Sequence, residues 1–140
     1  MTAFADLDPM PGFSPDPDTL RAVGWLSADR PFPTGPSSQA FVDRLKALIG
    51  SAFQPVQSMG FHECDLCQFD GALGTANLFL PGDGLLYVCP ELIVHYISTH
   101  HYQPPSEFVN AVLAAPDAAS MDFRKAFLAN GGRAIIRGFG

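Results

Sequence analysis

The clearest hydrophobic pattern in the chain is a helical one, and it lies in residues 37–53. Apolar residues recur there at the spacing of one helix face; they are Phe41, Val42, Leu45, Leu48 and Ile49. Ser37 or Ser38 can cap the first turn, because a serine hydroxyl accepts a hydrogen bond from a backbone N–H at that position. The segment therefore predicts an amphipathic helix with one buried face.

Further along, the pattern changes to two short apolar runs of strand-forming residues. Residues 75–80 read TANLFL, residues 85–89 read LLYVC, and PGDG connects them. Glycine in the connection accepts the positive φ values that a tight turn needs. The two runs therefore predict a β-hairpin.

Proline and serine mark the starts and ends of three further predicted helices. Pro90 suits the first position of a helix that runs up to Pro104, because its φ is already fixed and its missing N–H has no helical partner there. Segments 105–115 and 120–129 follow, and Ser120 caps the last one. The order of elements predicts an α+β fold, in which a small β-hairpin or sheet packs against three to four helices.

The start of the chain has a different character, because seven of the 13 prolines precede residue 37. Each proline lacks a backbone donor and disfavours helix in the residue before it. We expect a flexible Pro-rich arm over residues 1–17 and a single α+β domain over residues 18–140. Within this domain, residues 19–27 are expected to form a short strand or turn that packs Trp25.

Composition agrees with one packed domain and argues against two kinds of partner. The chain has 140 residues, of which 47% are hydrophobic, so it can bury a core without disulfides. Its net charge of -6 disfavours nucleic acid, because phosphate backbones are held by clustered Lys and Arg. No apolar run reaches the ~18 residues that span a bilayer, and the first residues show no secretion signal. We therefore expect a cytoplasmic protein without a membrane partner.

The candidate chemistry lies in histidine and cysteine, which are rare in this chain and concentrated in one part of it. All four histidines and all three cysteines fall between residues 62 and 101. They are His62, Cys64, Cys67, Cys89, His95, His100 and His101. In a reducing compartment, a C-x-x-C pair indicates a metal or redox site more often than a disulfide.

The spacing of these residues favours zinc, because it reads C-x2-C-x27-H-x4-H. Zinc takes four ligands tetrahedrally at ~2.0 to 2.3 Å, and the turn of a C-x-x-C knuckle brings both sulfurs to one point. We predict one zinc ion per chain, and its ligands are Cys64, Cys67, His95 and His100. Two alternatives stay open, since His62 beside the knuckle or Cys89 before the helix can replace one helical histidine. His101 is expected at the surface.

The two helical histidines do not share one line of an ideal helix. At 100° per residue their directions differ by ~140°, so they converge only if the last turn tightens or unwinds. The sequence YQPP directly after His101 favours such a helix end. The buried face of this helix is expected to consist of Leu92, Ile93, Tyr96 and Ile97.

A closed structural site is favoured over a catalytic site and over a redox dithiol. Four protein ligands close a structural zinc site, whereas a catalytic site keeps one position for water. The chain has no H-E-x-x-H, deaminase or phosphate-loop motif. The segment after Cys67 does not resemble the helix start that activates a redox pair. The alternative function is a small metal-dependent hydrolase with an open zinc site, in which Glu91 or Glu63 acts as base.

Two segments resemble an uncharacterised bacterial protein family. They are GFHECDLC and NLFLPGDGLLYVCPELIVHYISTHHYQPPSEF, and the family's pattern is similar to G-x-H-x-C-x-x-C followed by Y-V-x-P-x-L-I-x-H-Y-I-x-x-H-x-Y-x-P-P. The resemblance covers residues 60–115. By position it implies a metal role for His62, Cys64, Cys67, His95 and His100, and it supplies no activity.

The full prediction is a zinc-stabilised interaction or regulatory module, with a zinc knuckle as part of its α+β fold. Structural zinc contributes ~10 to 16 kcal/mol in small finger peptides, which is enough to pin a hairpin to a helix. The expected partner is another protein. We expect an exposed aromatic patch of Tyr96, Tyr102 and Phe108 to receive it.

Overall fold

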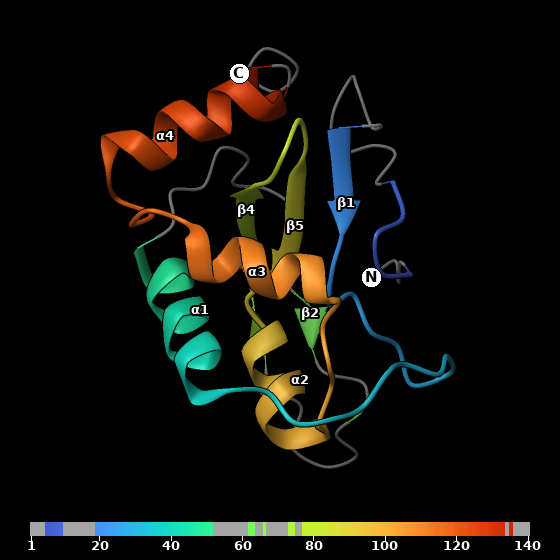
Figure 1. Cartoon of the computed structure of the whole chain (residues 1–140). Helices are drawn as coiled ribbons and strands as arrows, with labels where there is room; N and C mark the ends of the chain where they lie inside the picture. The colour runs from blue at the N-terminus through green and yellow to red at the C-terminus, as the bar shows by residue number, and fades with distance from the viewer. Residues whose placement is uncertain are drawn as a thin grey trace.

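A computed structural model describes residues 5–9, 19–51, 62–63, 66, 73–74, 77–133 and 135 (Figure 1). Its elements, in chain order, are β1 (Leu20–Ala22), α1 (Gln39–Ser51), β2 (His62–Glu63), β3 (Leu73–Gly74), β4 (Asn77–Pro81), β5 (Leu86–Pro90), α2 (Ile93–His100), α3 (Ser106–Ala114), α4 (Met121–Phe127) and the π-helical turn η2 (Leu128–Gly132). The α+β prediction is confirmed, since a small mixed sheet packs against four α-helices in this part of the chain.

The main sheet has the strand order β1-β5-β4, so β5 is its central strand. β4 and β5 form the antiparallel hairpin predicted from the sequence, with Asn77 opposite Pro90. β1 lies parallel to β5, with Leu20 opposite Leu86. Residues 19–27, predicted as a strand or turn, therefore supply the third strand of this sheet, and Trp25 is buried beside it.

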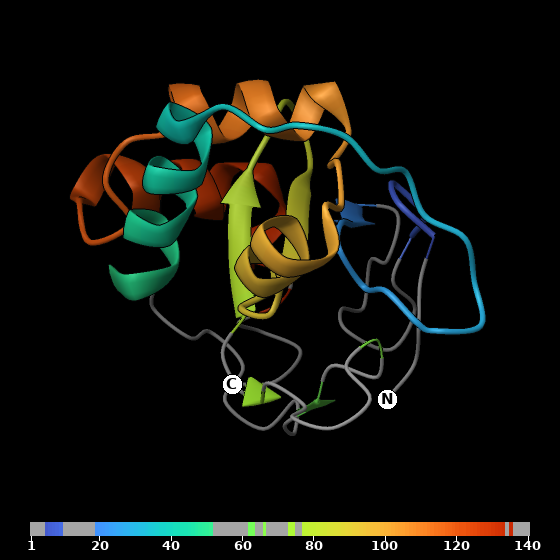
Figure 2. The ribbon, with the colours of Figure 1, turned by 90° about the horizontal axis from the view of Figure 1, so that it is seen from below.

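The main sheet is buried on both faces, and its strands alternate between two cores. Tyr87 and Cys89 point into the main core, while Leu86 and Val88 point into a second core on the other face. This alternation follows from the two-residue period of a strand. α1, α2 and α3 supply most of the helical residues of the main core, and Phe127 at the end of α4 belongs to the second core. Figure 2 shows this arrangement from below, with α2 nearest the viewer.

The predicted amphipathic helix is confirmed as α1. Phe41, Leu45 and Leu48 are buried on its inner face. The Phe41 N–H donates to Ser38 Oγ at 3.2 Å, so Ser38 is the cap. A serine at this position satisfies one of the N–H groups that a helix start leaves without an internal partner.

The prediction that Pro90 starts a helix is wrong. Pro90 is the last residue of β5, and α2 begins at Ile93. The strand extends this far because β4 pairs with it as far as Pro90, whereas β1 pairs only with Leu86, Tyr87 and Val88. The missing N–H of proline thus falls where β5 has no partner strand on the β1 side, and it costs no sheet hydrogen bond there.

Part of the predicted N-terminal arm contacts the domain. The Leu7 N–H donates to the Ala22 carbonyl at 2.6 Å, and the Ala22 N–H donates to the Asp8 carbonyl at 2.9 Å. Residues 5–9 therefore lie along the edge of β1. Residues 1–4 and 10–17, the rest of the arm, lie outside the described residues, and for them the prediction stays a prediction.

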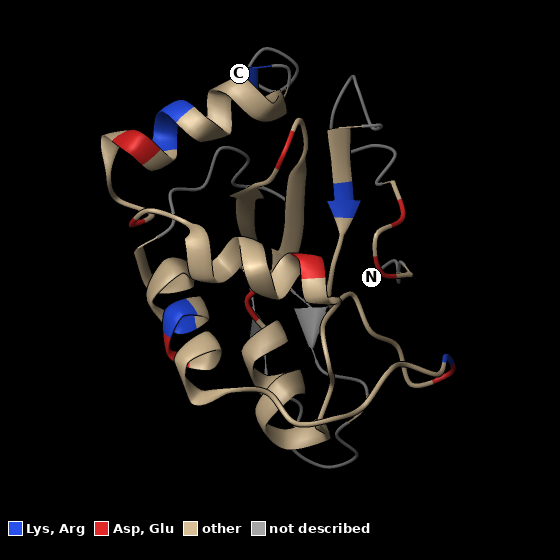
Figure 3. Ribbon diagram, viewed as in Figure 1, with Lys and Arg blue, Asp and Glu red and all other residues tan. Residues whose placement is uncertain are grey.

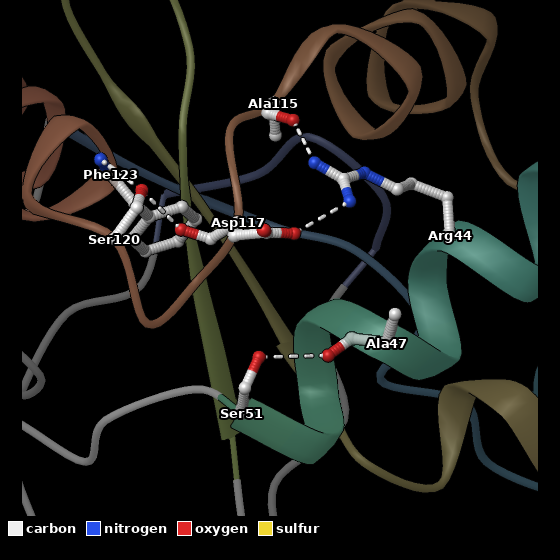
Figure 4. Close-up of polar contacts among 7 residues, drawn as sticks. All are labelled: Arg44, Ala47, Ser51, Ala115, Asp117, Ser120 and Phe123. Carbon is white, nitrogen blue, oxygen red and sulfur yellow. Dashed lines mark hydrogen bonds and ion pairs between the residues drawn. The ribbon is translucent and has the colours of Figure 1, made fainter.

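An ion pair joins α1 to the connection between α3 and α4 (Figure 4). Arg44 Nη1 donates to Asp117 Oδ1 at 3.0 Å, and Nη2 donates to the Ala115 carbonyl. The side chain of Arg44 is 28% exposed. The guanidinium thus spans two segments that lie far apart in the chain.

The basic side chains of the described residues are dispersed. Lys and Arg are spread over β1, α1 and α4 rather than gathered in one patch (Figure 3). None of the described helices is both long and apolar enough to cross a membrane.

The cap of α4 provides a test of these local interactions. Ser120 Oγ accepts from the Phe123 N–H at 3.2 Å (Figure 4), and losing such a cap costs ~1 kcal/mol. We therefore expect Ser120→Ala to lower the free energy of unfolding by about 1 kcal/mol in a denaturant titration. Ser51→Ala is the control, because Ser51 is exposed at the C-terminal end of α1 and its Oγ donates to the Ala47 carbonyl of the same helix. Equal effects of the two substitutions would contradict the capping role.

Candidate metal centre

The structure brings two of the four predicted ligands together on α2. The ring centroids of His95 and His100 are 5.1 Å apart, and the rings are nearly perpendicular at 78°. Both side chains are half-buried at the surface of the domain. The two imidazole rings are thus neighbours, although residues 95 and 100 point in different directions on an ideal helix.

α2 ends directly after the second histidine. His101 has a left-handed backbone conformation, with φ at 58°, and α2 stops directly before it. The Tyr102 N–H then donates to the Tyr96 carbonyl at 3.1 Å and closes the helix end. His95 lies in the first turn of α2 and His100 is its last residue.

Burial of the inner face of α2 orients the histidines toward the surface. Ile93 and Tyr96 are fully buried, and Leu92 and Ile97 are nearly so, as predicted. The ring of Tyr96 contacts both histidine rings, with centroid distances of 6.2 Å to His95 and 6.5 Å to His100. The histidine pair thus rests on the edge of the main core.

Electrostatics favour the neutral form of His95. Burial lowers the pKa of His95 below its ordinary value of 6.5, and the neighbouring His100 lowers it further. A metal ion binds the neutral imidazole, so a low pKa removes the competition with protons at neutral pH. Thr99 Oγ1 lies 3.4 Å from His95 Nδ1, the kind of contact that often orients a histidine ligand through its second nitrogen.

The predicted cysteine ligands lie outside the described residues, but the backbone on both sides of them is described. β2 and β3 pair antiparallel, with His62 opposite Gly74 and Glu63 opposite Leu73. Cys64 and Cys67 lie between these two strands along the chain. β2 and α2 both lie at the lower end of the main sheet in Figure 1.

Leu66, which separates the two cysteines, provides a further constraint. Its side chain is partly buried and packs against the main core, to which Ile93, Tyr96 and Ile97 of α2 also belong. Leu66 and the histidine helix therefore contact the same group of buried side chains.

Two other candidates have positions that disfavour metal binding. Cys89 is fully buried in β5, and burial strongly raises the pKa of its thiol. Cys89 lies inside the main core, whereas the side chains of His95 and His100 are half-buried at the surface, and this position disfavours Cys89 as a ligand. His101 is exposed, as predicted.

Within the part of the chain that the structure describes, no three His, Cys, Asp or Glu side chains group closely enough to hold a metal. His95 and His100 are thus two of the four residues that the sequence predicts as ligands. Complete coordination requires residues from elsewhere in the chain, which the sequence predicts to be Cys64 and Cys67.

The predicted aromatic docking patch is wrong. Tyr96, Tyr102 and Phe108 are all fully buried in the main core. Their spacing matched the inner faces of α2 and α3, and buried aromatic residues follow the same periodicity as an exposed stripe.

Sequence reasoning also missed the contact between Asp6 and Tyr102. The Tyr102 hydroxyl donates to Asp6 Oδ2 at 2.8 Å, across 96 positions of the chain. No spacing rule connects two residues so far apart, and Asp6 lies in a segment whose prolines suggested a flexible arm.

The fold and this pair of residues define a small α+β domain with two surface histidines on one helix. Residues 2–113 match a domain of unknown function, DUF7919, and the chain belongs to that family. The matched range includes both the cysteine segment and the histidine helix. No match was found among the curated proteins or among the solved structures.

The pKa of His95 provides a direct test of the geometry in metal-free protein. We expect its ring protons to titrate below 6.5 by NMR. His100→Gln should raise this pKa, because it removes one of its two causes, and His101→Gln should leave it unchanged. The unfolded chain binds this proton more readily, so the free energy of unfolding should fall as the pH drops through 6.5 and below. Titration of His95 at or above 6.5 would contradict the structure.

Proposed function

We propose that this protein is a zinc-stabilised domain, in which one ion joins the loop after β2 to the C-terminal turn of α2. The observation that carries the proposal is the histidine pair, whose ring centroids are 5.1 Å apart on the helix end. Cys64 and Cys67 would supply the other two ligands. This set closes the tetrahedral sphere of zinc with protein atoms.

The surroundings of the histidine pair favour thiolates as the remaining ligands. No Asp, Glu, Lys or Arg occurs in α2, and the inner face of the helix is apolar. Two thiolates and two neutral imidazoles balance the charge of Zn²⁺. A neutral assembly is far less costly than a net charge at the edge of an apolar core.

The chain between the ligands supports the same arrangement. β2 and β3, which pair antiparallel, flank both cysteines along the chain. Leu66, which lies between the cysteines in the sequence, packs against the core to which α2 also contributes. A metal bond from the cysteines to α2 would therefore add to the contact that Leu66 already makes.

A closed site of this kind suits an interaction or regulatory module, because no coordination position is left for substrate. The competing hypothesis is a metal-dependent hydrolase, with Glu91 or Glu63 as base. It requires an open position with a bound water on the metal. Coordination number and the effect of losing one ligand separate the two functions.

Metal content and stability of ligand variants test the proposal. Protein purified under reducing conditions should hold about one zinc per chain, and a chelator should unfold the cysteine loop and loosen α2 in circular dichroism. Cys64→Ser and His95→Ala should each lose the metal and lower the melting temperature. His101→Asn and Cys89→Ala are the matched controls, and both should retain the metal.

Two results would contradict the proposal. A folded protein without metal under these conditions would remove the site. If His95→Ala kept both the metal and the fold but removed a hydrolytic activity, the site would be catalytic rather than structural.

A further inference from the structure

The N-terminal segment is attached to the domain through one carboxylate that reaches two separate elements. Asp6 Oδ1 accepts from the Gly24 N–H at 3.1 Å, two residues after the end of β1. Asp6 Oδ2 accepts from the Tyr102 hydroxyl at 2.8 Å, two residues after the end of α2. The side chain of Asp6 thus links the edge of the main sheet to the end of the histidine helix.

Tyr102 is close to the candidate ligands along the chain and is firmly held. It follows His100 by two positions, its side chain is fully buried, and its N–H donates to the Tyr96 carbonyl at 3.1 Å. It also forms an isolated bridge with Thr34. Any displacement of Tyr102 would move the turn that carries His100.

Because packing around Asp6 is incomplete, the contact between the N-terminal segment and the domain depends largely on hydrogen bonds. A cavity of about 340 Å³ lies beside it, with Trp25 and Phe32 among its lining residues. The space between the N-terminal segment (residues 5–9) and the domain is therefore not completely filled. Apart from the side chain of Leu7, which packs against the main core, its described attachments are hydrogen bonds.

Partial burial strengthens the hydrogen bond that the Tyr102 hydroxyl donates to Asp6. Burial raises the pKa of Asp6, while the hydrogen bonds from Gly24 and Tyr102 act in the opposite direction and stabilise the carboxylate. Hydrogen bonds to a charged group in a partly buried place are stronger than neutral ones. If one partner of such a hydrogen bond is removed, the other polar group stays buried without a hydrogen bond. The free-energy cost of removing that group from water is then not offset.

We infer that Asp6 is a positioning residue for the proposed zinc site, because its hydrogen bond to Tyr102 fixes the end of α2, which carries His100, relative to the edge of the main sheet. This inference rests on the proposed function for its consequence in metal binding. The link between the segment and α2 is itself independent of any metal.

The test compares two tyrosine-to-phenylalanine substitutions that each remove one hydroxyl bond to a carboxylate. Tyr102→Phe removes the bond to Asp6. Tyr87→Phe is the matched control, because the Tyr87 hydroxyl also donates at 2.8 Å, to Glu107 on α3. Both tyrosines are buried, so the two variants lose similar contacts at different places.

The first measurement is amide hydrogen exchange in metal-free protein. Tyr102→Phe should accelerate exchange at position 102 and in the last turn of α2 by about tenfold, the change that corresponds to ~1.4 kcal/mol. Tyr87→Phe should leave these amides unchanged. The second measurement is competition titration with Co²⁺ and Zn²⁺, in which only Tyr102→Phe should weaken the affinity, again by about tenfold.

The two measurements distinguish a failure of the proposed zinc site from a failure of the positioning role of Asp6. If wild-type protein binds no metal, the proposed function fails, and the exchange data alone decide whether Asp6 holds the helix end. If both variants change exchange in α2 equally, or neither changes it, the positioning role is wrong. If metal binds but the two variants have the same affinity, the link does not serve the site. Asp6→Ala gives the same comparison from the segment side, should Tyr102→Phe fail to fold.

Discussion

The pairing of β5 with two neighbours is the constraint on which the rest of this structure depends. As the central strand it joins β1 and β4, and it alternates its side chains between the main and the second core. It also runs, through a two-residue turn, into α2. The histidine helix therefore follows the strand that contributes to both cores. A metal ion bound to this helix would be connected through it to that central strand.

Much of the fold could be predicted, because local patterns carry it. The inner face of α1, the β4–β5 hairpin and the Ser120 cap each depend on residues within one turn or one hairpin. Pro90 was misplaced because a strand end and a helix start tolerate proline for the same reason, the absence of a required N–H. Only the extent of pairing with β1 and β4 distinguishes them, and that is a tertiary property.

The candidate site could be predicted in part. Composition alone identified the histidines and cysteines, and the helical pattern predicted which face of α2 is buried. The approach of His95 to His100 was not expected from an ideal helix, and the left-handed conformation of His101 at the helix end was not specified by the sequence. The contact of Asp6 with Tyr102, like the burial of the aromatic residues expected at the surface, arises from packing between distant segments.

X-ray absorption at the zinc edge of the purified protein tests the central claim most directly, because it counts the donor atoms around the ion. A closed Cys₂His₂ site predicts two sulfurs at ~2.3 Å and two nitrogens at ~2.0 to 2.1 Å. A sphere with a water oxygen in place of one protein donor would contradict the structural site, as would a sphere without sulfur.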